Sequence, residues 1–91
     1  MSSWNANMVA KSDIQDRLLE FITKNFMVER DEVDLDKSLV DEGIIDSFGL
    51  IEIGTFMETE FGLVVGEDDM VRANFGSVYR MVDFISSKVP A

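Results

Sequence analysis

Apolar side chains recur at intervals of three and four residues in three separate segments of this 91-residue chain. A stripe with this period covers one face of an α-helix, whereas a half-buried strand would alternate strictly. The stripes comprise Ile14, Leu18, Phe21, Ile22 and Phe26 in the first segment, Leu50, Ile53, Met57 and Phe61 in the second, and Val78, Met81, Val82 and Ile85 in the third. The pattern therefore predicts an all-α fold in which these faces pack together.

Capping residues mark the ends of the first two predicted helices. Ser12 followed by Gln15 has the spacing of a capping box, which predicts a first helix over residues 13–26. The second helix is expected to open at Asp46 and Ser47, since both residue types cap helices, and to stop at Gly62.

Two glycines, Gly49 and Gly54, lie inside the second helical pattern. Each costs roughly 1 kcal/mol relative to Ala in a helix interior. Their presence indicates a close approach by another backbone or by a ligand.

The last third of the chain holds a short helix and a long one. Residues 63–65 are apolar enough for a strand, but nothing else in the sequence would pair with them, so an ordered loop is expected. A short helical turn is predicted over residues 67–72. Ser77 is expected to cap a last helix that ends near Lys88. The whole pattern predicts a small antiparallel bundle of three main helices plus one short helix.

The connection between the first two helices, residues 27–46, is long for so small a domain. Long loops are usually functional or disordered. Single apolar residues recur through this one, among them Val33, Leu39 and Ile45. We therefore expect the connection to be pinned across the core, with a turn at Gly43.

The chain contains no Cys and no His. Disulfides, thiolate nucleophiles, Cys or His metal sites and a His general base are therefore excluded. Residues 31–42 have the length of a calcium-binding EF-hand loop, but Asp36 stands where that loop requires Gly. We predict no metal site and no catalytic residues, so the chain is not expected to be an enzyme.

Negative charge is concentrated in the middle of the sequence. The chain has 18 acidic and 8 basic residues, a formal net charge of −10, and residues 29–69 hold 14 of the acids but only two of the bases. This balance excludes a nucleic-acid partner, which requires a basic footprint. Two interpretations stay open: a solvated acidic loop, or a docking face that steers basic partners.

The ends of the chain carry few signals. No stretch approaches the roughly 18 apolar residues of a membrane span, so no membrane insertion is expected. The first ten residues lack the pattern of a signal peptide, which predicts a cytoplasmic location. Residues 1–11 are expected to form a flexible segment, in which Trp4 either frays or packs back on the domain, ahead of a single domain over residues 12–88.

The segment Gly43-Ile44-Ile45-Asp46-Ser47-Phe48-Gly49-Leu50 is the most informative. A Ser at the start of a helix is most often only a cap. Here it follows an acid and a long acidic loop, and an amphipathic helix follows it. This combination resembles the acyl carrier protein family, including the peptidyl and aminoacyl carriers.

The resemblance extends over roughly residues 12–87. Residues 58–62 resemble the acidic end of the family's second helix, and residues 63–65 its apolar loop. Residues 68–72 resemble its short third helix, and residues 74–85 its last helix with the entry to it.

The resemblance implies a carrier function. Ser47 would be the attachment point of 4′-phosphopantetheine, donated by coenzyme A through a separate transferase, and Asp46 would be the acid that precedes it. The thiol of the arm would hold an acyl or aminoacyl group as a thioester, in fatty-acid, lipid or secondary-metabolite biosynthesis. The protein would need no Cys, because the thiol arrives with the cofactor.

The resemblance also implies the partners. Phe48 and Ile51 match positions that partners contact beside the modified Ser, and Glu52, Glu58 and Glu60 would pair with bases on those partners. The expected partners are a phosphopantetheinyl transferase, an acyl- or aminoacyl-loading ligase, and synthases and transferases with basic docking patches. A monomer is expected. Ile53, Met57 and Phe61 are interpreted as core, with a cavity for an acyl chain as the alternative.

Some positions depart from the family's common fatty-acid pattern. Two residues separate Gly43 from Asp46, where one is more usual, and Thr55 stands where an apolar Met is typical. These departures favour a carrier for a specialised pathway. An aminoacyl or peptidyl carrier, and an acidic interaction module without any prosthetic group, remain the alternatives.

Overall fold

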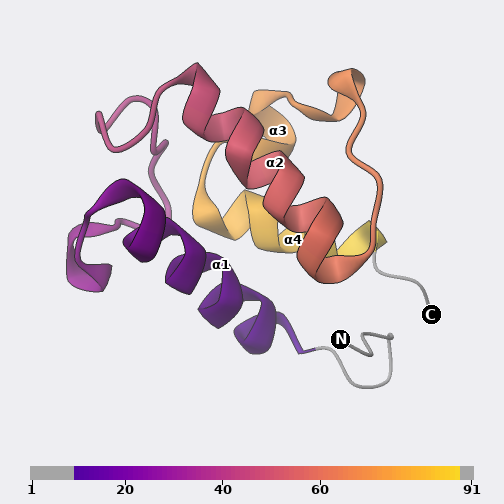
Figure 1. Ribbon diagram of the computed structural model, residues 1–91, viewed down its shortest axis with the longest axis horizontal. Coiled ribbons are helices and arrows are strands. Elements are labelled where there is room, and N and C mark those ends of the chain that lie inside the picture. The colour runs from indigo at the N-terminus through magenta and orange to yellow at the C-terminus, as the bar shows by residue number, and fades with distance from the viewer. Residues whose placement is uncertain (1–9, 89–91) are drawn as a thin grey trace.

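The computed structural model describes residues 10–88, and every regular element in this range is helical. The helices are α1 (Lys11–Phe26), α2 (Ser47–Phe61), α3 (Arg72–Phe75) and α4 (Val78–Lys88), with 3₁₀ turns at Arg30–Glu32 and Glu67–Asp69. Helices α1 and α2 run in opposite directions, and α4 crosses behind α2 (Figure 1). The predicted bundle of three main helices and one short helix is confirmed.

The apolar stripes meet in one core. Helix α1 packs against both α4 and α2, and α3 packs against α4. Each of the three predicted stripes contributes side chains with no solvent exposure at all. They are Ile14, Leu18 and Ile22 from α1; Ile53 and Met57 from α2; and Val78, Met81 and Ile85 from α4. Since burial of one such side chain stabilises a fold by roughly 1.5–3 kcal/mol, this core holds the bundle together. No helix within residues 10–88 has the length and apolar character needed to cross a membrane.

Helix α1 begins earlier than predicted, and the predicted Ser12 cap is wrong. The cap position is Ala10, whose carbonyl accepts from the N–H groups of Asp13 and Ile14, and Ser12 lies inside the first turn. The Lys11 ammonium lies 2.8 Å from a carboxylate oxygen of Asp83 on α4, and both side chains are largely exposed. Of the segment predicted to be flexible, residues 1–11, Lys11 belongs to α1. Residues 1–9, with Trp4, lie outside the described residues, and for them the prediction stays a prediction.

The connection between α1 and α2 is an ordered structure, as predicted. Val33, Leu39 and Ile45 are buried in the core. The Leu39 carbonyl accepts from the N–H groups of Ile44 and Ile45, at 2.9 and 3.3 Å. The predicted turn at Gly43 is confirmed by its left-handed φ of 75°.

The connection is also bonded to α4. The Leu35 carbonyl accepts from the Tyr79 N–H at 3.1 Å, and this N–H is one of those that a helix start cannot pair internally. Ser77 caps the same helix as predicted, since its hydroxyl accepts from the Arg80 N–H at 3.2 Å. The start of α4 therefore serves as an anchor for the connection.

The segment after α2 forms a loop and not a strand, as predicted. Gly62 ends α2 with a φ of 69°. Residues 63–65 have no regular structure, and the Glu58 carboxylate accepts from the Val65 N–H at 2.8 Å.

The position predicted for the short helix, residues 67–72, is wrong. Residues 67–69 form only a 3₁₀ turn, in which the Asp69 carboxylate accepts from the Gly66 N–H. Val71 has an extended backbone, with φ −120° and ψ 162°, and α3 begins after it. The Asn74 side-chain amide donates to the Asp69 carbonyl, which ties the two short elements together.

Replacing Met27 by Gly is expected to stabilise the fold. Met27 ends α1 in the left-handed region, with φ 56°, and its side chain is 93% exposed, so it contributes strain and little packing. Met27→Gly should raise the free energy of unfolding by about 0.5–1 kcal/mol, measured by urea denaturation. Val64→Gly is the control, because Val64 is also highly exposed but has no positive φ. A loss of stability in Met27→Gly would contradict the argument.

Candidate functional site

Ser47 is the first residue of α2, and its hydroxyl has no partner among residues 10–88. The cap of α2 is Asp46, whose Oδ1 accepts from the Gly49 N–H at 2.9 Å. The Ser47 side chain is exposed and makes no hydrogen bond to any of the residues 10–88. The helix therefore does not need this hydroxyl as a cap.

The start of α2 can accept a phosphodiester. The N–H groups of Ser47 and Phe48 have no acceptor within the described part of the chain, and the first turn of α2 carries no acidic residue. Free N–H groups and the helix dipole together favour an anion at this end of a helix. The serine oxygen and the local electrostatics therefore suit a phosphate-linked group.

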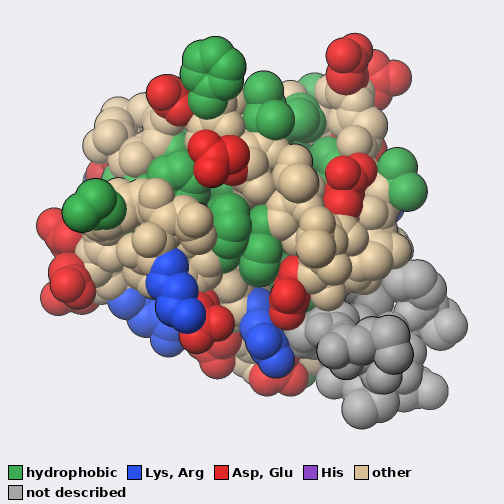
Figure 2. All heavy atoms as spheres, in the orientation of Figure 1, with side chains coloured by type: hydrophobic (Ala, Val, Ile, Leu, Met, Phe, Trp, Pro, Cys, Tyr) green, Lys and Arg blue, Asp and Glu red, His purple; other side chains and the backbone are tan. Residues whose placement is uncertain are grey.

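Apolar and acidic side chains surround Ser47 on one side of α2. Phe48 is 75% exposed and Ile51 is 55% exposed, and Glu52 is also exposed. At about 100° per residue these side chains project within one broad sector of the helix that also contains Ser47. Figure 2 shows hydrophobic and acidic side chains along the edge of the molecule above α2, while basic side chains gather below, along α1. We name the surface formed by Ser47, Phe48, Ile51 and Glu52 the docking face.

The other two predicted recognition residues have partners within the fold. Glu58 lies on the same side of α2, but its carboxylate accepts from the Val65 N–H. Glu60 lies on the side of α2 that faces α1, and its carboxylate is 3.5 Å from the Arg17 guanidinium. The structure therefore brings Phe48, Ile51 and Glu52 together with Ser47 and leaves Glu60 outside this group.

The glycines inside α2 have different environments. A Cβ on Gly49 would lie 3.0 Å from both the Phe26 ring and the Ile45 Cβ. A Cβ on Gly54 would lie 3.7 Å from Met70, which is ordinary contact distance. The close neighbours of Gly49 are side chains, chiefly the aromatic ring that ends α1, and not the backbone or ligand that was predicted.

Three apolar residues of α2 belong to the core. Ile53, Met57 and Phe61 are at most 2% exposed and pack with α1 and α4 in the same cluster. Their burial agrees with the core interpretation.

One contact near the docking face could not have been found from the sequence. The Arg72 guanidinium of α3 lies 3.2 Å from the Asp41 carboxylate in the connection. The two residues are 31 positions apart, and only the fold brings them together.

Comparison with known proteins identifies the family. The family model described as the phosphopantetheine attachment site matches residues 16–85. The chain therefore belongs to the phosphopantetheine-binding carrier proteins.

Curated relatives support the same family. An acyl carrier protein of Petrotoga mobilis is 27% identical over 81 residues, which cover 89% of this chain and 93% of the relative. Acyl carrier protein 2 of Pseudomonas aeruginosa is 27% identical over 78 residues, 86% of this chain and 96% of the relative. A D-alanyl carrier protein of Streptococcus suis is 26% identical over 70 residues, 77% of this chain and 87% of the relative.

Membership defines the cofactor and the kind of protein. 4′-Phosphopantetheine is the group that this family attaches, so it is the cofactor of this chain. Members are carriers and not enzymes, which agrees with the prediction from the missing Cys and His.

Replacing the two glycines of α2 by Ala should have opposite effects. Gly49→Ala should lower the free energy of unfolding by about 1–2 kcal/mol, because overpacking against Phe26 exceeds the gain in helix propensity. Gly54→Ala, the matched control, should raise it by up to ~1 kcal/mol. Chemical denaturation of both variants measures the difference, and equal effects would contradict the packing argument.

Substitution by Ala at the two residues at the start of α2 should change stability by different amounts. Asp46→Ala removes the cap and should cost about 0.5–2 kcal/mol of stability. Ser47→Ala should change stability by no more than about 0.5 kcal/mol, since its hydroxyl has no partner within residues 10–88. Thermal unfolding monitored by circular dichroism would measure both. A larger loss in Ser47→Ala than in Asp46→Ala would show that the cap has been assigned to the wrong residue.

Proposed function

We propose that Ser47 is the attachment point of 4′-phosphopantetheine and that the chain carries acyl groups as thioesters on this arm. In the transferase reaction the Ser47 oxygen bonds to the pantetheine phosphate of coenzyme A. The nucleotide half of coenzyme A leaves, and the serine proton passes to a base of the transferase. The terminal thiol of the arm then bears the cargo. Asp46, beside it, holds the helix end in place.

The observation that carries the proposal is the free hydroxyl of Ser47. A serine that serves as a cap would be bonded to the backbone, but here Asp46 has that role. The position lies within the region matched by the family model and at a helix end that favours a phosphodiester. An exposed hydroxyl with no structural task is available to an enzyme.

The proposed partners meet the docking face. Phe48 and Ile51 supply exposed apolar area beside Ser47, and Glu52 supplies charge for basic residues of the partner. Single exposed ion pairs are weak, so the acids act mainly on encounter rate and orientation. The partners would be the transferase that installs the arm, the ligase that loads it, and the synthases and transferases that consume the cargo. Glu58 and Glu60 would contribute less, because the fold already uses them.

Intact mass spectrometry tests the attachment site. The purified protein, incubated with coenzyme A and a broad-specificity phosphopantetheinyl transferase, should gain the mass of one phosphopantetheine, and Ser47→Ala should gain none. Ser12→Ala is the matched control, because Ser12 is another exposed serine in the first turn of a helix. An unchanged mass with several transferases, or modification that persists in Ser47→Ala, would refute the proposal.

An aminoacyl carrier is the second candidate. The relatives named D-alanyl carrier protein are about as similar to this chain as those named acyl carrier protein. Loading assays with fatty-acyl and amino-acid ligases on the modified protein would separate the two. The alternative of an acidic module without a prosthetic group disagrees with the match to the phosphopantetheine attachment family.

A further inference from the structure

Two depressions adjoin one another between the connection, α2, α3 and α4. The smaller, about 210 Å³, is lined mostly by residues with apolar side chains, among them Val40, Leu50 and Phe75. The larger, about 590 Å³, is lined mostly by residues with polar or charged side chains from α3, α4 and residues 36–42. Ser38, Arg72 and Gly76 line both. We treat them as one groove with an apolar half and a polar half.

The apolar half begins beside Ser47. Leu50 lies three residues after Ser47, which is about 4.5 Å along the helix axis. The polar half has no wall from α2. A flexible arm attached to Ser47 would meet the apolar half first and could place its end in the polar half.

The polar half contains a cation that has no carboxylate or aromatic partner in the part of the chain that the structure describes. Of the eight basic residues, all of which lie within residues 10–88, six pair with a carboxylate and Lys88 lies over the Phe84 ring. Arg80 has neither kind of partner in the described structure. It also stands in the first turn of α4, where the helix dipole disfavours a positive charge. An anion in the groove would give Arg80 a partner and would offset its unfavourable interaction with the helix dipole.

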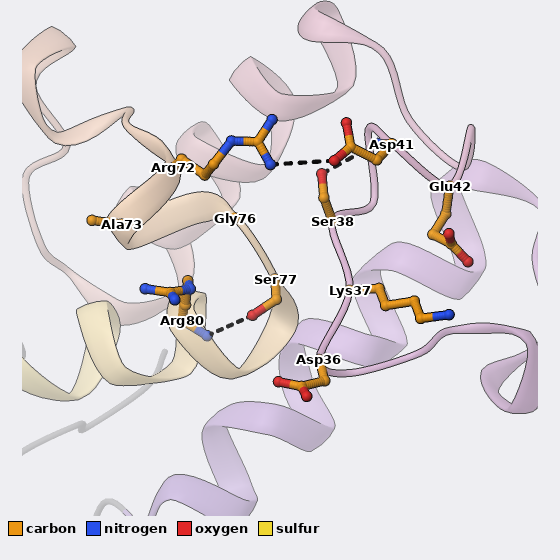
Figure 3. A pocket seen from close by; sticks show the side chains of 10 residues that line it. All are labelled: Asp36, Lys37, Ser38, Asp41, Glu42, Arg72, Ala73, Gly76, Ser77 and Arg80. Carbon is orange, nitrogen blue, oxygen red and sulfur yellow. Dashed lines mark hydrogen bonds and ion pairs between the residues drawn. The ribbon is translucent and has the colours of Figure 1, made fainter.

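The two halves meet at an ion pair that can exchange. Figure 3 shows the Arg72 guanidinium reaching across the groove to Asp41, whereas no ion pair is drawn to Arg80. The Arg72 and Asp41 side chains are 74% and 60% exposed. Pairs this exposed contribute little net stability, so a second carboxylate can share or replace Asp41 at small cost.

We propose that the groove selects cargo that ends in a carboxylate. The arm lies along the apolar half, and the distal carboxylate of a short dicarboxylic acid, joined to the arm through its other carboxyl as the thioester, binds Arg80 with Arg72 beside it. This inference rests on the proposed attachment at Ser47. Because the arm tethers the cargo, weak contacts are enough: a short flexible tether gives an effective concentration in the millimolar range.

An ammonium-bearing cargo fits the groove less well. Asp36, Asp41 and Glu42 also line the polar half. Unpaired acids, however, are common on this surface, which has ten more acids than bases, so they give an ammonium no preference for this place. An unpaired Arg occurs here alone among the described basic residues.

A pair of cargoes tests the inference. A phosphopantetheinyl transferase would install either glutaryl- or pentanoyl-phosphopantetheine, two chains of equal length that end in a carboxylate and a methyl group. Amide and Arg Nε–H NMR spectra of both forms, and of the form without cargo, report on Arg80, Ser77 and Ala73. An exposed ion pair corresponds to roughly a 1.5- to 5-fold change in an equilibrium constant, and the groove-bound population should favour glutaryl by that factor.

Variants complete the test. Arg80→Gln should remove the glutaryl-specific shifts, whereas Arg30→Gln, which removes an exposed Arg from the far side of the connection, should keep them. Equal shifts for both cargoes, shifts already present without cargo, or no effect of Arg80→Gln would overturn the inference. A stronger effect with an aminoacyl cargo would overturn it in favour of the acids. If no cargo can be installed at all, the proposed function fails as well, and the mass spectrum shows this separately.

Discussion

The contact between the Phe26 ring and the Gly49 backbone determines where Ser47 lies. Phe26 is the last residue of α1, and its ring occupies the space that any side chain at position 49 would fill. The same glycine donates its N–H to the Asp46 cap. Gly49 thus contacts both the end of α1 and the cap of α2, and these two contacts together fix the position of Ser47. The rest of the site depends on this arrangement.

The acidic residues divide into two groups with different tasks. Some are used inside the fold: Asp46 as a cap, Glu58 on the loop after α2, and Glu60 with Arg17. Others, such as Glu52, project from the docking face without such a task. The acidic residues of the central segment therefore do not all have the same role, and only those of the second group are available to a partner. The sequence left open a solvated acidic loop or a docking face, and the docking-face interpretation of the exposed acids is part of the proposed function.

The sequence predicted what depends on periodicity and on local chemistry. The three main helices, the turn at Gly43 and the stop at Gly62 follow from side-chain spacing and glycine conformation, and all are found. The Ser12 cap failed because α1 begins at Lys11, so the cap position falls on Ala10 and Ser12 lies inside the first turn. The short helix was misplaced because Val71 is extended and Asn74 bonds back to Asp69, neither of which leaves a periodic signal.

The candidate site could likewise be predicted from the sequence where it depends on a single helix. Ser47 and its neighbours lie on one helix, where spacing in the sequence fixes direction in space, and so the docking face could be expected. The pairing of Glu60 with Arg17 depends on the position of α1, and the groove depends on four segments meeting. Such features require the tertiary structure.

The backbone bonds of the connection have a consequence for motion. Leu39 holds the turn before α2, and Leu35 holds the first turn of α4, yet neither bond belongs to a helix. Because Val33, Leu39 and Ile45 of the connection belong to the core, opening it would expose buried apolar area as well as break these bonds. The wall that the connection contributes to the groove is therefore expected to keep its shape while an occupant enters or leaves.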